Sequence, residues 1–274
     1  MKTKFPAALL LLAILGSLAL AQRWRNWTPD PDVRPDRNGV PDWEVNKHMP
    51  NDVFTYVRLK YDSWSKPGSW LTDYPDCDIN FSYRLQELTS MEVHPDGLIL
   101  EIEDERLFDY PWCYMSEPGG LNLSDAEAAT LRKYLLNGGF LMVDDFWGDW
   151  EWAGFMEAFE KVFPDRKWTE LPIEHPIFNC VFTLKEKPQI PALGTAIQGR
   201  EQGITWEWHK PNAETPHYRA YFDDDGRMCA IICHNTDLGD GWEREGEDEW
   251  YFREFAEKKA YPLGINIIFY SLTH

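Results

Sequence analysis

The chain has 274 residues, and its 46 Asp and Glu outnumber its 27 Lys and Arg, giving a formal net charge of −19. A surface this acidic repels phosphate groups, which disfavours binding to nucleic acids and to anionic membranes. Five Cys are too few for a disulfide-framework protein of this length, and no C-x-x-C pair is present to suggest a zinc ribbon or a thioredoxin-like motif. We expect no metal and no cofactor, and a small molecule, a glycan or a peptide as the partner.

Residues 1–21 have the features of a cleaved secretory signal peptide. Two lysines in the first four residues precede an uninterrupted apolar run, and Ala19 and Ala21 place small side chains at positions −3 and −1 of a cleavage site. The alternative is a membrane anchor, but the run is short for a bilayer span, which needs about 20 apolar residues. We therefore expect a mature protein that begins at Gln22, is not embedded in the membrane, and is periplasmic or extracellular.

The mature chain divides into an arm and a domain. Residues 22–52 are rich in Pro, Asp, Arg and Trp, which is typical of an irregular segment, and we expect this arm to dock through Trp24, Trp27 or Trp43. A single α/β domain is predicted over residues 53–274, a length that can bury a sizeable core.

Short strands alternate with helices along the domain. Runs of β-branched, aromatic or continuously apolar residues predict strands at 53–59, 98–102, 111–115, 140–143, 218–222 and 227–233. Capping residues and helical periodicity predict helices that begin at Asp78 and at Ser124, and others at 150–163, 250–257 and 263–272. A long acidic loop is expected over residues 234–249. The alternation favours an open, mostly parallel sheet with helices on both faces, to which the segment 218–233 adds a β-hairpin.

Polar and aromatic residues follow four of these strands. In open parallel sheets, ligands bind outside the carboxyl ends of the strands, so these residues are the candidate ligand-binding set. They are Tyr61, Asp62 and Trp64 after the first strand, Glu117 after the third, Asp144, Asp145 and Trp147 after the fourth, and Asn235, Asp237, Asp240 and Trp242 after the last. His175, which precedes a proline, is a further candidate, although a lone His in a loop more often makes a structural hydrogen bond.

Two acidic features leave alternatives open. Asp144 is expected to face the ligand, whereas Asp145 could equally cap the helix that follows. The loop 237–249 could bind calcium through its carboxylates, but it lacks the spacing of an EF-hand, and a solvated acidic loop is the favoured interpretation.

The sequence also resembles a known family. The motifs are FTYVR at 54–58, DYP at 73–75, DINF at 78–81, YLLNGGFL at 134–141, VDDFWG at 143–148, HPIF at 175–178 and HNTDLGDGWE at 234–243. Together they resemble the bacterial family called domain of unknown function 4159, which is similar to the class I glutamine amidotransferase-like folds. The resemblance covers residues 54–274 and implies a flavodoxin-like three-layer sandwich. It implies no activity.

Three functions compete. The first is an exported, non-catalytic module for ligand binding or assembly. The second is a hydrolase of saccharides or peptides that uses Asp144 with Asp237 or Asp240 as acid and base. The third is a cysteine enzyme of the amidotransferase type, which is disfavoured because no Gly-x-Cys-x-Gly turn is present to expose a nucleophile. Two carboxylates within reach across a cleft would support an enzyme, and scattered carboxylates bonded to backbone would support a binding module.

Overall fold

The computed structural model describes residues 29, 33–46, 48 and 52–274. The sequence predictions on residues 1–28, including the signal peptide, Trp24 and Trp27, lie outside the described residues. Seven strands of the described chain form one sheet, and two short strands pair separately.

The strands are β1 (Val57–Lys60), β2 (Asp62–Ser63), β3 (Leu98–Glu101), β4 (Trp112–Ser116), β5 (Leu121–Asn122), β6 (Phe140–Asp144), β7 (Thr169–Glu170), β8 (His217–Phe222) and β9 (Met228–His234). The α-helices are α2 (Asp76–Leu88), α3 (Asp125–Leu136), α4 (Gly148–Val162), α5 (Leu193–Gly199), α6 (Leu238–Glu243), α7 (Glu249–Tyr251) and α8 (Tyr261–Thr273). A π-helix, η6 (Phe252–Ala260), joins α7 to α8. The short 3-10 helices of the described residues are η1 (Ser69–Leu71), η2 (Glu105–Asp109), η3 (Pro118–Gly120), η4 (Pro176–Phe178) and η5 (Arg200–Gln202).

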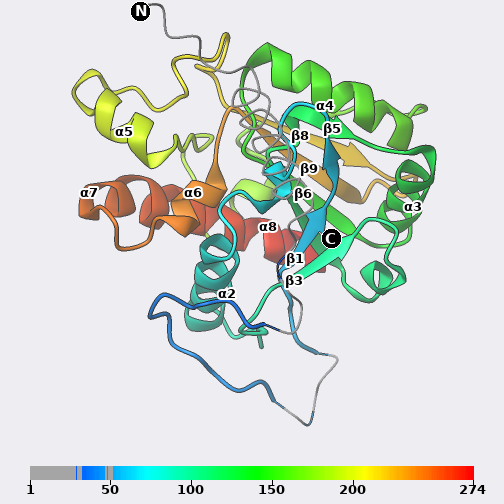
Figure 1. Cartoon of the computed structure of the whole chain (residues 1–274), viewed down its shortest axis with the longest axis horizontal. Helices are drawn as coiled ribbons and strands as arrows, with labels where there is room; N and C mark the ends of the chain where they lie inside the picture. The colour runs from blue at the N-terminus through cyan, green and yellow to red at the C-terminus, as the bar shows by residue number, and fades with distance from the viewer. Residues whose placement is uncertain (1–28, 30–32, 47, 49–51) are drawn as a thin grey trace, which may run out of the picture.

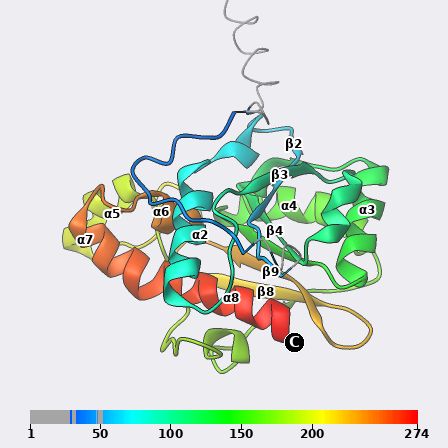
Figure 2. The ribbon, with the colours of Figure 1, turned by 90° about the horizontal axis from the view of Figure 1, so that it is seen from below.

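The molecule has three layers, because successive residues of a buried strand face opposite sides of the sheet. In β6, Phe140 and Met142 belong to the core formed with α2 and α8, whereas Leu141 and Val143 belong to the core formed with α3 and α4. Figure 1 and Figure 2 show α3 and α4 together on one side of the sheet and α2 and α8 on the other. The predicted three-layer α/β class is confirmed.

The order of the parallel strands identifies where a ligand should bind. The strands of the large sheet have the spatial order β3-β1-β4-β6-β9-β8-β7. Counted along the chain, its parallel strands β1, β3, β4, β6 and β9 have the order 2-1-3-4-5, which is the doubly wound, flavodoxin-like order. The hairpin extends this sheet, since β9 pairs parallel with β6 while β8 pairs antiparallel with β9. The strand order reverses between β1 and β4, and ligands of such folds bind at that point, outside the carboxyl ends of the strands.

Two local predictions were wrong. Asp78 does not cap α2: it lies inside the helix, fully buried, because its carboxylate pairs with Arg58 of β1. The segment 237–249 is not a solvated acidic loop. Its first part forms α6, in which Asp240 is 5% exposed, and Asp237, at 4% exposed, caps α6 by accepting a hydrogen bond from the Asp240 backbone N–H. The capping box at Ser124 is present as predicted, with Glu127 as its second member.

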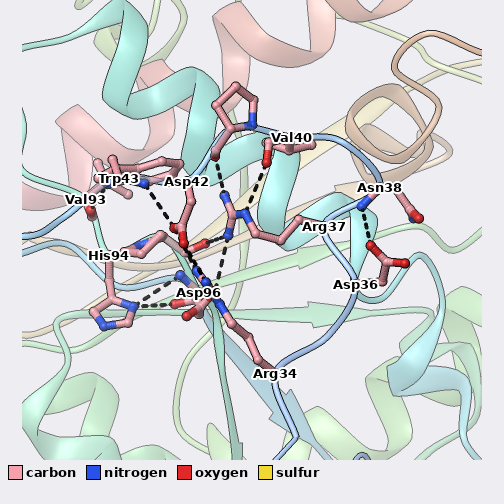
Figure 3. Close-up of polar contacts among 12 residues, drawn as sticks. Arg34, Asp36, Arg37, Asn38, Val40, Asp42, Trp43, Val93, His94 and Asp96 are labelled. Atoms are coloured by element: carbon pink, nitrogen blue, oxygen red, sulfur yellow. Dashed lines mark hydrogen bonds and ion pairs between the residues drawn. The ribbon is translucent and has the colours of Figure 1, made fainter.

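The described part of the arm lies against the loop that precedes β3 (Figure 3). The Trp43 indole N–H donates to the Val93 carbonyl at 2.7 Å, and Arg37 donates to the Pro95 carbonyl at 2.6 Å. Asp96 accepts from Arg34 as well, at 2.8 Å. These contacts fix the arm on the β3 side of the molecule.

In the part of the chain that the structure describes, no helix combines the length and the apolarity needed to cross a membrane.

Candidate functional site

A cavity of about 390 Å³ opens at the carboxyl edge of the sheet. The segments that follow β1, β4, β6 and β9 all contribute to its wall, as the sequence predicts for this edge of a parallel sheet. Its charged lining is unbalanced, because seven carboxylates face only three Lys or Arg side chains. The carboxylates are Asp73, Glu117, Asp145, Glu151, Glu207, Asp237 and Asp240, and the cations are Lys66, Lys210 and Arg244.

Four residues at the carboxyl edge of the sheet have an unusual backbone conformation. Asp73, Glu117, Asp145 and Asn235 have φ of 65°, 49°, 59° and 60°, in the left-handed region that residues other than glycine rarely occupy. Each such residue costs on the order of 1–3 kcal/mol, and backbone of this kind clusters at functional sites. Three of the four line the cavity.

Two buried side chains hold this backbone in place. Arg58 of β1 ion-pairs with Asp78 and also donates 2.9 Å hydrogen bonds to the carbonyls of Trp70 and Thr72, which fixes the segment that carries Asp73. Asn235 accepts from the Gly148 N–H at 2.8 Å and donates to the carbonyls of two residues, Asn212 and Thr215. Hydrogen bonds from these two buried polar side chains therefore fix the backbone that forms the cavity wall.

Four of the seven lining carboxylates have at least two partners each. Glu117 accepts from Lys66 at 2.5 Å and from Thr72, and Glu151 pairs with Lys210 and accepts from the Trp147 backbone N–H. Glu207 accepts from the Ala192 backbone N–H and the Thr195 hydroxyl. Asp240 accepts from the Leu193 backbone N–H at 2.6 Å and pairs with Arg244.

The remaining three, Asp73, Asp145 and Asp237, make no ion pair within the described chain. One carboxylate oxygen of each lies within 4.8 Å of those of the other two. They are 9%, 7% and 4% exposed, and Oδ2 of Asp73 is buried without a hydrogen-bond partner. Burial raises the pKa of all three carboxyls well above the usual range, and the neighbouring carboxylates raise it further. This cluster is the least neutralised part of the cavity.

Asp144 lies behind this cluster and does not line the cavity. Its Oδ2 accepts from the Tyr114 hydroxyl at 3.1 Å and from the Gly239 N–H at 3.0 Å, and the residue is fully buried. Burial raises its pKa to about 7. Gly239 has to be glycine here, because a Cβ would lie 2.5 Å from Asp73 Oδ2 and 2.9 Å from the Tyr114 hydroxyl oxygen.

The structure places five of the twelve candidate residues on the cavity wall. They are Glu117, Asp145, Trp147, Asp237 and Asp240. The Trp147 indole N–H points at Asp145, 3.4 Å from its Oδ1.

The other seven candidates lie elsewhere. Asp62 and Trp64 are exposed outside the cavity, and Tyr61 is buried beneath it, where its hydroxyl donates to the Ser116 carbonyl. Trp242 belongs to the core between α2 and α6, and Asn235 and Asp144 act as the buried supports described above. His175 caps the short helix η4 by accepting from the Ile177 N–H, and its ring lies against Tyr270.

Sequence reasoning missed several cavity residues. Asp73 is the most important of them, and its signal was the DYP motif in a segment following a strand. Lys66 and Thr72 come from the same segment, Lys210 comes from the Pro-rich stretch before β8, and Arg244 follows α6. They belong to irregular connections, for which periodicity gives no information.

The thiols give no nucleophile at this site. Four of the five Cys are buried and Cys180 is exposed. Burial raises the pKa of the Cys113 and Cys233 thiols far above neutrality, which suppresses the reactive thiolate.

His234, the last residue of β9, gives the fold a predicted acid sensitivity. Its Nδ1 lies 3.1 Å from Arg219 and its Nε2 lies 3.1 Å from the Gly148 carbonyl, so the neutral ring accepts from the guanidinium and donates to the carbonyl. Burial, reinforced by Arg219, lowers its pKa from 6.5 to about 3. Below pH 6.5 the His234 imidazole is protonated in the unfolded chain but stays neutral in the folded chain. The free energy of unfolding therefore falls as the pH falls from 6.5 towards 3.

We expect this residue alone to cost about 2 kcal/mol between pH 7 and pH 5. The measurement is urea unfolding of the wild type and of His234→Gln at both pH values. Glutamine can keep both hydrogen bonds without titrating, so its variant should lose about 2 kcal/mol less over this range. Equal losses in the two proteins would contradict the assignment.

The fold and the cavity together define a doubly wound α/β protein with an acid-lined cavity at the switch point of its sheet. The family model described as "Domain of unknown function (DUF4159)" matches residues 54–272, and the chain belongs to that family. No curated protein matches the chain.

Proposed function

We propose that the protein is an exported binding module and that its cavity takes a ligand bearing a positively charged group, such as a basic peptide side chain or an amino sugar. The observation that carries the proposal is the excess of carboxylates in the wall, seven against three cationic side chains. Opposite charges attract strongly inside a cleft with low-dielectric walls, and like charges are excluded. Trp147 adds an aromatic surface beside the carboxylates.

Export is part of this proposal. Its support is the basic start, the apolar run and Ala19-Leu20-Ala21. Intact-mass analysis of the protein from its host should show a chain that begins at Gln22. Retention of Met1 on a membrane-bound product would contradict it.

The relation to the class I glutamine amidotransferase-like folds is proposed at the level of fold alone. The 2-1-3-4-5 order of the parallel strands supports it. The chemistry of those enzymes is not proposed, because none of the described residues in the cavity wall is a cysteine.

A hydrolase remains the second candidate, and one observation favours it. Carboxylate oxygens of Asp145 and Asp237 lie within 4.8 Å of each other in the cavity wall, close to the separation of about 5–5.5 Å between the two carboxyl groups of a retaining glycosidase. The pairing suggested by the sequence would have to change, since Asp144 does not line the cavity. Asp237 and Asp240 each accept a hydrogen bond from backbone N–H, which is the arrangement expected of a binding module.

The test is a thermal-shift screen of the purified protein against basic peptides, amino sugars, neutral glycans and acidic peptides. A ligand at a hundred times its dissociation constant should add about 2.7 kcal/mol to the free energy of unfolding. We expect the response to come from the cationic compounds and to be lost in Glu117→Gln. A response confined to acidic peptides would contradict the proposal. Turnover of a hit that stops in Asp145→Asn would favour the hydrolase.

A further inference from the structure

Asp73, Asp145 and Asp237 form a cluster whose charge is left without compensation. The seven lining carboxylates fall into two groups. Four have at least two hydrogen-bond or ion-pair partners each, whereas these three make no ion pair within the described chain and accept at most one hydrogen bond each there, from Trp147 to Asp145 and from the Asp240 N–H to Asp237. Gathering three carboxylates out of water is unfavourable unless a proton or a cation offsets their charge. The arrangement therefore requires a positively charged species among them.

An oxygen of Asp73 that has no partner among the described residues is independent evidence that a ligand binds to this cluster. The Asp73 side chain is buried, at 9% exposed, and makes no hydrogen bond to any described residue, and Oδ2 has no contact with water. Buried polar atoms in proteins are almost always paired, so an orphaned carboxylate oxygen marks a ligand site or a strained group. Gly239 keeps the space beside this oxygen free of side-chain atoms, since a Cβ there would approach it to 2.5 Å.

The geometry fits one metal ion. Oxygens within 4.8 Å of one another can all contact a single ion, because two ligands on opposite sides of a calcium ion at about 2.4 Å are about 4.8 Å apart. Three carboxylate oxygens form a hard donor set, the kind that Ca²⁺ and Mg²⁺ prefer over softer metals. The cavity leaves the outer side of the ion open to water or to a ligand.

A second carboxylate set is less suitable. Asp240 and Glu243 also come within 4.8 Å of Asp73, but Arg244 lies 3.4 Å from Asp240 and 2.7 Å from Glu243. The guanidinium already neutralises that side of the cluster and would repel a nearby metal ion.

We propose that Asp73, Asp145 and Asp237 bind a divalent cation, Ca²⁺ or Mg²⁺, at the floor of the cavity. This departs from the sequence-based expectation of no metal. This site rests on the proposed function, because it lies in the same cavity. The bound ion would orient polar groups of the ligand, and the surrounding carboxylates would bind the positively charged group of the ligand.

The experiment is calorimetric titration of EDTA-treated, dialysed protein with CaCl₂ and, separately, with MgCl₂, together with melting curves at each concentration. We expect saturable binding by at least one of the two cations and a rise in melting temperature that EDTA reverses. Terbium provides a second probe, because Tb³⁺ replaces Ca²⁺ in oxygen sites and Trp147, beside Asp145, should sensitise its emission. Added Ca²⁺ should quench that emission by displacement.

Two variants and a control make the assignment specific. Asp73→Asn and Asp145→Asn should each weaken cation binding by roughly tenfold or more. Without cation they should melt at or above the wild-type temperature, because a repelling charge is removed. Asp62→Asn removes an exposed carboxylate near the same edge and outside the cavity, and should bind the cation as the wild type does.

The inference is overturned if neither cation changes the heat signal or the melting temperature. It is also overturned if both cavity variants keep wild-type affinity, or if Asp62→Asn loses as much as they do. The titration contains no organic ligand, so absence of cation binding beside an intact response to basic compounds rejects this site alone. Cation binding without any response to organic ligands rejects the proposed function alone.

Discussion

Replacing Arg58 with methionine should lower the free energy of unfolding by about 3–5 kcal/mol, the cost of breaking a buried ion pair by removing one partner. Arg58 is completely buried in β1 and Asp78 is 1% exposed in α2, so the carboxylate left behind would have neither water nor a counter-ion. The carbonyls of Trp70 and Thr72 would lose their donor as well. Urea unfolding at neutral pH measures the loss.

The double variant Arg58→Met/Asp78→Leu is the matched control. Replacing both partners with apolar residues removes the uncompensated charge, so the double variant should be more stable than the single one. Its remaining deficit should reflect the two carbonyls. A loss in Arg58→Met no larger than the roughly 1 kcal/mol of an exposed ion pair would contradict the role assigned to this arginine.

The same substitution should also affect the cavity. Arg58 fixes the segment that ends in Asp73, whose left-handed backbone has to be held by its surroundings. Cation affinity should therefore fall in Arg58→Met even at urea-free, low-temperature conditions where the variant is folded. The segment that ends in Asp73 therefore couples the stability of the fold to the geometry of the cation site, because Arg58 contributes to both.

The sequence predicted those parts of the fold in which local pattern and tertiary environment agree. The run 140–143 is apolar on every residue because β6 is covered on both faces, and this run predicts both the strand and the edge at which Asp145 emerges. The capping box at Ser124 is likewise a local signal that the whole structure uses.

Prediction from the sequence failed where contacts between residues distant in the sequence determine the local structure. Nothing near Asp78 in the sequence indicates that an arginine 20 residues earlier buries its carboxylate inside a helix. The sequence of α6 contains two glycines and two acidic residues in six positions, so it has no helical periodicity. Its glycines are required by close contacts with residues distant in the sequence. A Cβ on Gly241, for example, would approach that of Ala260 to 2.5 Å.

The candidate aromatic residues show the same limit. Trp147 and Trp242 both follow predicted strands, and sequence alone gives no reason to separate them. In the structure, Trp147 lines the cavity and Trp242 lies in the core. The ring centroid of Trp242 lies 4.4 Å from that of Phe81 and 6.0 Å from that of Tyr114. The difference arises from α6, which turns Trp242 towards α2.

Truncating Trp242 to alanine should therefore act through stability, at a cost of about 3–5 kcal/mol. The indole is fully buried, and Gly264 of α8 admits it closely, since a Cβ there would lie 2.6 Å from the ring. The lost volume would loosen α6, whose Asp240 forms part of the cavity wall, so ligand and cation responses should weaken in parallel with stability.

Trp242→Phe separates packing from chemistry. Phenylalanine keeps an aromatic ring against Phe81 and removes the indole N–H, which is buried and has no hydrogen-bond partner among the described residues. Its loss of stability should be clearly smaller than that of Trp242→Ala, because the cavity is smaller and an unsatisfied donor disappears. Urea unfolding of both variants, with and without CaCl₂, is the measurement. If Trp242→Ala kept wild-type stability and lost ligand binding alone, the indole would belong to the site and α6 would have to be placed differently against α2.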